Sequence, residues 1–342
     1  MLRLPAFCLP LLVLVGCSGG NPSTPSSPAT SNGSGASPAA KPAEAQRKIG
    51  VSLLTFKNPF FKVIADNIEA EGNKQGYKAI SLSADEDPAR QSQQVKDFVA
   101  QKVSAIVISP CVSKAIVPVI QEANEAGIPV FTVDIPCREE GVDIVCQVAT
   151  DNFNGGEQAG AAMIEALGEQ GGKVAIIDYK QAESCILRVE GFKKAIAAHN
   201  EKAGANGKVE IAVELDGGGD KEIGLRAMDD ALQSTSDLRG VFAINDPSAL
   251  GARAAIEKAM KEASIVIIGF DGQLEGRQAI RDGKIFADPI QYPDRMGVEV
   301  VKAIVAYSKG EEVPKELKIP TTLYRKGDAE KEFADASSKA GK

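Results

Sequence analysis

Short apolar runs alternate with stretches of helical periodicity from Lys48 onward, and this alternation limits the folds that the chain can adopt. The run Val103–Ser109 is continuous and rich in β-branched residues, which is typical of a strand covered on both faces. We expect strands at residues 49–54, 78–83, 103–109, 129–133, 173–178, 208–215, 240–244, 264–270 and 284–290. Helices between strands predict parallel sheets with right-handed crossovers. Because the strands are too many for one compact sheet, we predict an α/β fold with two doubly wound parallel-sheet domains. A TIM barrel is the less favoured alternative.

Several predicted strands are followed by a polar residue at the carboxyl end. These residues are Ser109, Asp134, Thr150, Asn245 and Asp271. In open parallel sheets, ligands bind in the crevice beyond the carboxyl ends of the strands. Each residue could instead cap the following helix, because Asp, Asn, Ser and Thr are preferred N-caps. Together, the polar endings favour a site for a polar ligand.

The composition excludes several functional classes. The chain of 342 residues has a formal net charge of −7, which argues against a nucleic-acid partner. Its one histidine, His199, leaves little material for a histidine metal site or a Ser-His-Asp triad. The glycine-rich stretches at 216–220 and 269–272 do not form a Walker-type phosphate loop. We therefore expect no catalytic residues, no metal and no cofactor.

The first residues carry the pattern of an export signal. Arg3 precedes the apolar run Leu9–Val15, which is too short to span a bilayer. The run ends in Leu-Val-Gly-Cys, which looks like a lipobox, so we predict a lipoprotein signal peptide over residues 1–17 and a membrane anchor on lipidated Cys17. A plain secretory peptide is the alternative. Residues 18–47 are rich in Ser, Pro, Ala and Gly and predict a disordered linker.

Export would place the remaining cysteines in an oxidising compartment. These cysteines are Cys111, Cys137, Cys146 and Cys185. Four cysteines allow three complete pairings, and the sequence does not choose among them. One disulfide that includes Cys137 and four free thiols are both left open.

A series of short motifs between Lys48 and about Arg325 is more specific than composition. The motifs are Asn58–Phe61, Ala149–Asn152, Arg188–Phe192, Val241–Asp246, Ala249–Ala252, Gly269–Gly272 and Gln291–Asp294. In their order and spacing the chain resembles the ribose-binding group of type I periplasmic binding proteins, the solute receptors of ABC transporters. The resemblance implies two lobes joined by a three-segment hinge that can close around a ligand. It assigns residues 48–150 and 292–319 to the first lobe, 151–291 and 320–332 to the second, and 333–342 to a flexible tail.

The resemblance also implies where the ligand binds. The matching positions are Asn58, Phe60, Phe61, Ser109, Asp134, Arg188, Asn245, Asp271 and Gln291. Their amides and carboxylates would exchange hydrogen bonds with sugar hydroxyls, and Arg188 would donate from the second lobe. The phenylalanine rings would pack on the apolar face of a sugar ring. Thr150 matches a hinge position behind the site.

Three positions depart from the ribose-binding pattern. Ile135 stands where an arginine is usual, Gly219 where an aromatic ring is usual, and Ser109 where an asparagine is usual. Each change removes a contact, and a buried hydroxyl left without its partner costs about 1–3 kcal/mol. The ligand is therefore expected to be a monosaccharide or similar polyhydroxylated molecule that need not be ribose. Gly219 is expected to leave open space beside it.

The expected function is binding without chemistry. We predict a monomeric, exported lipoprotein of the periplasm or cell surface that delivers its sugar to an ABC transporter permease. The alternative is a sensory module for a chemoreceptor or histidine kinase, with a polyol, nucleoside or autoinducer-type furanose as its ligand. The export signal argues against a repressor core of the same fold, and no acid–nucleophile pair can be placed for a glycosidase.

Overall fold

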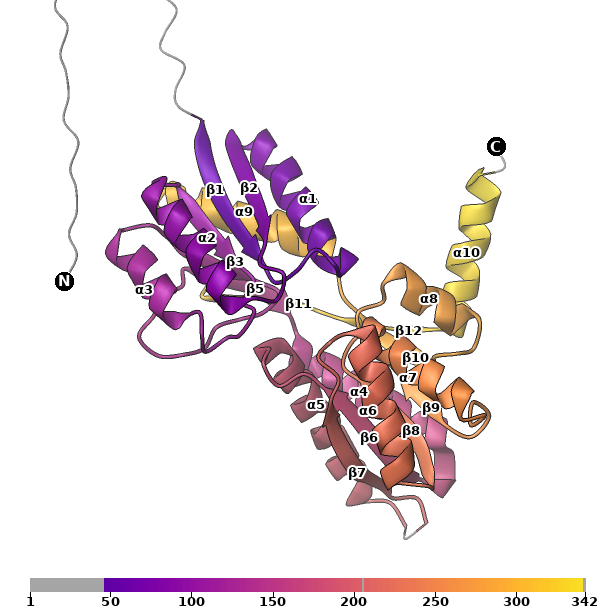
Figure 1. The fold of residues 1–342 in the computed structure, drawn as a ribbon. Helices are drawn as coiled ribbons and strands as arrows, with labels where there is room; N and C mark the ends of the chain where they lie inside the picture. Colours follow the sequence, from indigo (N-terminus) through magenta and orange to yellow (C-terminus); the bar gives the residue numbers. More distant parts are fainter. Residues whose placement is uncertain (1–45, 205, 341–342) are drawn as a thin grey trace, which may run out of the picture. The chain divides into compact units, whose positions relative to one another are not determined.

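The computed structural model describes residues 46–204 and 206–340, with side chains up to residue 336 (Figure 1). The predicted signal peptide, the lipidation of Cys17 and residues 18–45 of the predicted linker lie outside the described residues. Arg47, which the sequence assigned to the linker, is the first residue of strand β1 (Arg47–Leu53).

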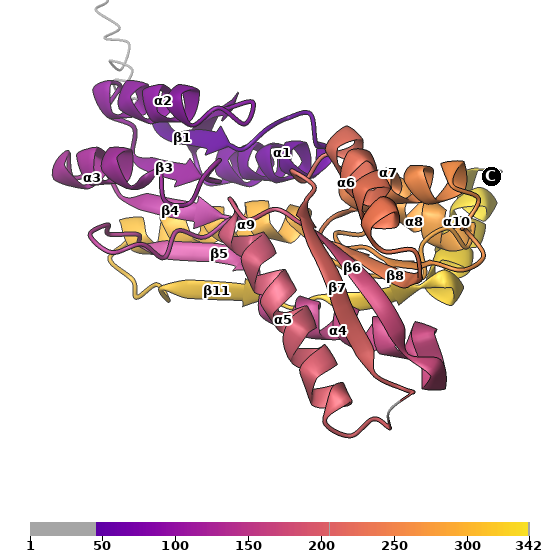
Figure 2. The same ribbon diagram turned by 60° about the horizontal axis from the view of Figure 1, so that its bottom comes forward.

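One sheet has the strand order β11-β5-β4-β3-β1-β2, and every pairing in it is parallel. Its other strands are β2 (Tyr77–Ser83), β3 (Ala105–Ile108), β4 (Val130–Val133), β5 (Cys146–Thr150) and β11 (Glu316–Ile319). Strand β11 lies beside β5 at the sheet edge (Figure 2), and Ile319 pairs with Thr150. We call this sheet and its helices the first lobe.

The second sheet has the order β12-β10-β9-β8-β6-β7. Its strands are β6 (Gly172–Asp178), β7 (Val209–Asp216), β8 (Leu238–Ala243), β9 (Val266–Ile268), β10 (Ala287–Ile290) and β12 (Thr322–Arg325). All pairings are parallel except that of β12 with β10. We call this sheet and its helices the second lobe. The prediction of two doubly wound α/β sheets is confirmed, and the TIM barrel alternative is wrong.

Helices cover both faces of each sheet (Figure 1). In the first lobe they are α1 (Pro59–Lys74), α2 (Pro88–Ala100), α3 (Val117–Glu125) and α9 (Pro293–Ser308). In the second lobe they are α4 (Asn152–Leu167), α5 (Glu183–Asn200), α6 (Lys221–Ser234), α7 (Asp246–Lys258), α8 (Leu274–Arg281) and α10 (Lys326–Ala340), with a short 3-10 turn at Gly168–Gln170. Helix α9 packs on α1, β4 and β5, although it follows β10 of the second sheet in the chain.

The chain passes between the two sheets three times: from β5 to α4 and β6, from β10 to α9, and from β11 to β12. The strands β5, β11 and β12 were not among the predicted ones, although Thr150, which ends β5, was expected at a strand end. In β11 and β12 polar and apolar side chains are mixed, so neither forms a continuous apolar run. Both therefore lack the pattern that identified strands such as β3.

The C-terminal segment differs from the expected flexible tail. Helix α10 continues to Ala340, and Phe333 packs against the apolar core of the second lobe. The Arg281 guanidinium lies 4.8 Å from the centroid of the Phe333 ring. Residues 333–340 thus belong to a helix that contacts the second lobe through Phe333.

The cysteines Cys111, Cys137, Cys146 and Cys185 are buried free thiols. Two of their sulfur atoms lie close to backbone carbonyl oxygens: Cys137 Sγ is 3.3 Å from Ser113 O, and Cys111 Sγ is 3.9 Å from Leu54 O. The sequence left open one disulfide that includes Cys137 or four free thiols. The structure has four free thiols, and Cys137 forms no disulfide.

A bilayer-spanning helix would have to be both long and apolar. No helix within the described ranges 46–204 and 206–340 meets both conditions.

Candidate ligand-binding site

A buried ion pair occupies the carboxyl edge of the second sheet. Arg188 on α5 and Asp271, which follows β9, are 3% and 5% exposed. Arg188 Nη1 lies 3.0 Å from Asp271 Oδ1 and also donates to the carbonyl oxygen of Ile244 at 2.7 Å. Arg188 Nε donates to Asn152 Oδ1 at 2.8 Å, and its Cζ lies 3.9 Å from the centroid of the Phe270 ring. These contacts on several sides fix the guanidinium in one orientation.

Hydrogen bonds connect Asp271 to the crossings between the lobes. Gln291 Nε2 donates to Asp271 Oδ1 at 2.6 Å, and Thr150 Oγ1 donates to Gln291 Oε1 at 2.6 Å. Thr150 ends β5 of the first sheet, and Gln291 follows β10 of the second. Gln273 Nε2 donates to Asp271 Oδ2 at 3.2 Å, so both carboxylate oxygens are held. The amide of Gln291, predicted to face the ligand, is thus also a structural link.

The first lobe contributes two buried polar side chains, Ser109 after β3 and Asp134 after β4. Within the part of the chain that the structure describes, Ser109 Oγ and Asp134 Oδ1 have no hydrogen-bond partner. Burial raises the pKa of Asp134 to about 7, while Arg188 acts to lower it and Asp271 to raise it. Arg188 and Asp271 of the second lobe thus both influence the pKa of Asp134 in the first lobe.

The backbone is strained at both carboxylates. Asp134 has φ 65° and Asp271 has φ 101°, a region that residues with a side chain rarely adopt. Such conformations cost on the order of 1–3 kcal/mol each and concentrate at functional sites. The strain at two aspartates that follow parallel strands supports their prediction as site residues.

Helix α1 brings together the other predicted residues of the first lobe. Asn58 Oδ1 accepts from the backbone N–H of Phe60 at 3.0 Å and caps the helix. The rings of Phe60 and Phe61 are 5.4 Å apart in an edge-to-face arrangement. Both rings, together with Ile135, belong to an apolar cluster of buried residues. The cap and the core contacts fix the orientation of this segment.

Both the oxygen and the nitrogen of the Asn245 side-chain amide form hydrogen bonds within the protein. Its Oδ1 accepts from the Ser248 N–H at 3.0 Å, and its Nδ2 donates to the Gly219 carbonyl oxygen at 2.9 Å. Gly219 has φ 65°, and a Cβ atom there would lie 3.3 Å from Asn245 Nδ2 and 3.7 Å from Tyr179 Cδ1. The expectation of open space at Gly219 is therefore wrong, because the Tyr179 ring borders it.

Two further carboxyl groups, Asp246 and Asp288, are buried near Asp271. Burial and the neighbouring Asp288 raise the pKa of Asp246, and burial raises the pKa of Asp288 to about 6. Asp246 Oδ1 and both oxygens of Asp288 lack a donor among the described groups, which a proton held between the two carboxyls would supply. Gln273 N donates to Asp246 Oδ2 at 2.5 Å. The pair thus supports the loop that carries Asp271.

Sequence reasoning missed several of these residues. They are Asn152, Tyr179, Asp246, Gln273 and Asp288. Asn152 and Asp246 are the last residues of the motifs Ala149–Asn152 and Val241–Asp246, so these motifs could have identified both. Asp288 gave no signal, because it lies within a covered strand and its partner is far away in the chain. In residues 46–204 and 206–340, no three His, Cys, Asp or Glu side chains are grouped to hold a metal ion.

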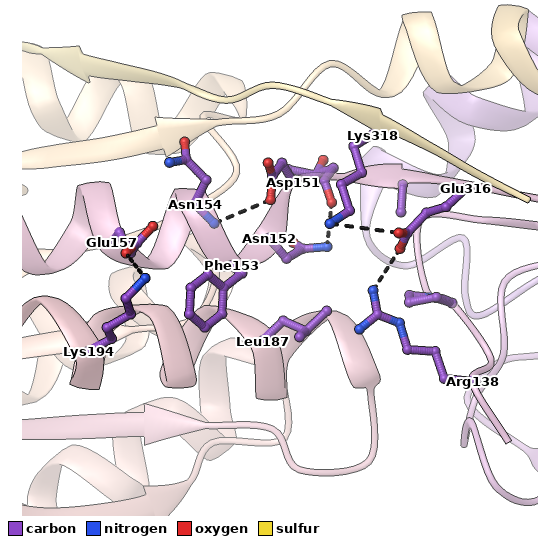
Figure 3. Close-up of a pocket in the computed structure, with 13 residues that line it drawn as sticks. Arg138, Asp151, Asn152, Phe153, Asn154, Glu157, Leu187, Lys194, Glu316 and Lys318 are labelled. Carbon is purple, nitrogen blue, oxygen red and sulfur yellow. Dashed lines mark hydrogen bonds and ion pairs between the residues drawn. The ribbon is translucent and has the colours of Figure 1, made fainter. Parts of the chain in front are cut away.

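A separate concavity of about 480 Å³ lies beside the crossings and shares Thr150 with the network above (Figure 3). Most charged side chains around it are paired with one another, whereas Asp151 accepts from the Asn154 N–H. Arg138 Nη2 lies 2.7 Å from Glu316 Oε1, and Lys194 Nζ lies 2.8 Å from Glu157 Oε1. Mixed ion pairs of this kind favour no particular ligand charge, so we assign no ligand to this concavity.

Two open α/β sheets with three crossings, and buried polar side chains at their carboxyl edges, define a two-lobed solute-binding protein. The family model of the periplasmic binding protein domain matches residues 49–312. The chain belongs to the periplasmic binding protein family, in the type I group that includes the ribose-binding proteins. The predicted family is therefore confirmed.

The relatives are binding proteins for import. The chain is 34% identical over 292 residues to the ribose import binding protein of Bacillus subtilis, with 83% of this chain and 90% of that protein covered. It is 31% identical over 272 residues to the D-apiose import binding protein of Paraburkholderia graminis, with 78% and 83% covered. A solved ABC transporter solute binding protein from Mycobacterium smegmatis with bound glycerol has a TM-score of 0.76 and 30% identity, with 84% of this chain and 96% of that one covered. The prediction that the chain is not an enzyme is confirmed by these relatives.

Proposed function

We propose that this protein binds a monosaccharide or a similar small polyol between its lobes and delivers it to an ABC transporter permease. One observation carries the proposal: Ser109 Oγ and Asp134 Oδ1 at the carboxyl edge of the first sheet are buried and have no partner among the described residues, and the buried Arg188–Asp271 pair of the second lobe influences the pKa of Asp134. Buried polar atoms are nearly always hydrogen-bonded, so these atoms suit the hydroxyls of a ligand.

The donor and acceptor types match a sugar. A carboxylate accepts from two neighbouring hydroxyls, and a guanidinium donates to hydroxyl oxygens, so Asp134, Asp271 and Arg188 together serve a diol. Phe60 and Phe61 supply apolar faces for the C–H side of a ring. The hydrogen bonds of Arg188 and Asp271 within the protein fix their geometry before the ligand arrives, which lowers the cost of binding. A ligand that contacts both lobes favours their closed arrangement.

The ligand class is broader than ribose. Ile135 lacks the donor that the ribose-binding pattern has at its position, Ser109 is shorter than the asparagine of that pattern, and the relatives above are named for ribose and for D-apiose. A pentose, a hexose in furanose or pyranose form, or a polyol meets the chemistry of the site.

A thermal-unfolding panel tests the proposal. It contains pentoses, hexoses, polyols, nucleosides and furanoses of the autoinducer type, with amino acids as the contrasting class. At least one carbohydrate or polyol is expected to raise the unfolding temperature, since ligand at 100 times Kd stabilises by about 2.7 kcal/mol. Calorimetry then gives its Kd. A response to an amino acid with none to any carbohydrate would contradict sugar binding.

We also propose that the protein is an extracytoplasmic lipoprotein anchored through Cys17, as the lipobox pattern indicates. The Cys17→Ala variant is expected to move from the membrane fraction to the soluble fraction, because no acyl chain can be attached. The Cys8→Ala variant, which changes a cysteine before the lipobox, is the control and should stay with the membrane. Equal membrane association of wild type and Cys17→Ala would exclude this anchor.

A further inference from the structure

Tyr179 stands at the carboxyl edge of the second sheet beside a predicted ligand contact. It directly follows β6, and the pairing of Ile177 with Ala243 places it level with Asn245 in the neighbouring strand end. Its ring edge lies 3.7 Å from the point where a Gly219 side chain would begin. Because Gly219 has a positive φ, this position cannot easily supply a ring of its own.

The segment that follows Tyr179 touches the first lobe. The backbone N–H of Ser113 donates to the Gln181 carbonyl oxygen at 3.4 Å, and the Glu183 N–H donates to Ser113 Oγ at 3.4 Å. The half-buried Tyr179 packs against a large apolar cluster that contains residues of both lobes. Tyr179 is thus a residue of the second lobe located where the two lobes meet.

The phenol group is surrounded by groups that keep it neutral. Burial raises the pKa of Tyr179, and the thiols of Cys185 and Cys111 and the carboxyl of Glu86 act in the same direction. Cys111 and Glu86 come from the first lobe, which agrees with the backbone contacts. A neutral aromatic ring in this position presents a flat face, which packs well on the apolar side of a sugar ring.

We propose that Tyr179 is the aromatic wall of the second lobe and determines ligand size, in the place that Gly219 leaves without a ring. The proposal rests on sugar binding as the function. In this role the ring would limit the ligand to a single small sugar or polyol and exclude larger molecules such as disaccharides.

The test compares Tyr179→Ala, Tyr179→Phe and wild type by calorimetry with D-ribose, D-allose, myo-inositol and the disaccharide sucrose. Tyr179→Ala is expected to bind the best of the small probes at least 10-fold more weakly and to bind sucrose relatively better by a similar factor. Tyr179→Phe keeps the ring and should stay within about threefold of wild type. Tyr307→Ala removes an exposed tyrosine on α9 and should bind as wild type does. Thermal unfolding without ligand checks that each variant is folded.

The outcomes separate this inference from the proposed function. If wild type binds none of the small probes or the wider panel, sugar binding itself fails, and the role of Tyr179 fails with it. If wild type binds a sugar and Tyr179→Ala binds it with the same Kd and the same discrimination against sucrose, only the assignment of Tyr179 is wrong. A loss in Tyr179→Phe equal to that in Tyr179→Ala would also overturn it, because the hydroxyl and not the ring would then matter.

Discussion

The Asp271→Ala variant is expected to lose about 3–5 kcal/mol of unfolding free energy, because the substitution leaves a buried guanidinium without its charged partner. Arg188 is 3% exposed and has its Nη1 3.0 Å from Asp271 Oδ1. The substitution also leaves Gln291 Nε2 and Gln273 Nε2 without their acceptor. Urea unfolding at pH 7 measures the loss. The Asp66→Ala variant is the control, because Asp66 pairs with Lys62 on the surface and such pairs contribute at most about 1 kcal/mol.

A double-mutant cycle shows whether the ion pair itself is responsible. The Arg188→Met/Asp271→Ala variant removes both charges and is expected to be more stable than the sum of the single variants predicts, by about 1–3 kcal/mol. Simple additivity would mean that the two side chains do not interact in solution.

A measurement of how Asp271 contributes to ligand affinity needs a variant that stays folded. Asp271→Asn keeps an oxygen acceptor for Arg188 and Gln291 and is the suitable probe of affinity. It is expected to weaken the best sugar of the panel about 100-fold, since hydrogen bonds to a charged group contribute about 1.5–3 kcal/mol each. An unchanged Kd would show that Asp271 does not face the ligand.

The Asp288→Asn variant is expected to be more stable than wild type at pH 7–8, by about 1–3 kcal/mol. Burial raises the pKa of Asp288 from 3.8 to about 6 in the folded protein. The folded state therefore holds a proton that the unfolded state releases, and the stability from this group is complete below pH 4 and declines as the pH rises to 6. An asparagine carries no charge, and its side-chain carbonyl oxygen can accept from the protonated Asp246 carboxyl.

Urea unfolding of wild type and Asp288→Asn between pH 4.5 and 8 measures this effect as the difference between the two curves. The difference is expected to grow from pH 4.5 to about 6 and then stay constant. Asp230→Asn, at an exposed position on α6, should follow wild type across the range. A variant that is less stable than wild type at pH 8 would mean that the Asp288 charge is satisfied in the native state.

Local patterns predicted the fold because segments rich in apolar residues alternate with helical stretches, and several helices begin at a clear signal. Asn58 with Pro59, for example, both caps α1 and starts it. The carboxyl-end rule then pointed to Asp134 and Asp271, whose positive φ values set them apart from ordinary caps. The family resemblance supplied Arg188, which lies inside a helix where no strand-end rule applies.

Other parts of the site depend on contacts between distant segments. The space at Gly219 could not be judged from its own position, because the Tyr179 ring that borders it comes from another strand end. Likewise, nothing local to Asp288 indicates that its carboxyl meets that of Asp246. The short strand β12 pairs at the sheet edge with β10, a strand of equal length from another part of the chain. Such features follow from the assembled sheets and have no counterpart in local periodicity.

The three crossings have a consequence for the order in which the protein can fold during synthesis. The first lobe takes its edge strand β11 and its helix α9 from residues 293–319, after the whole sequence of the second lobe up to β10. When the chain has been synthesised only as far as residue 150, the first sheet still lacks its edge strand β11. Helix α9, which packs on β4 and β5, is also still missing. Completion of the first lobe must therefore wait until residues 293–319 have emerged, which is almost the entire chain.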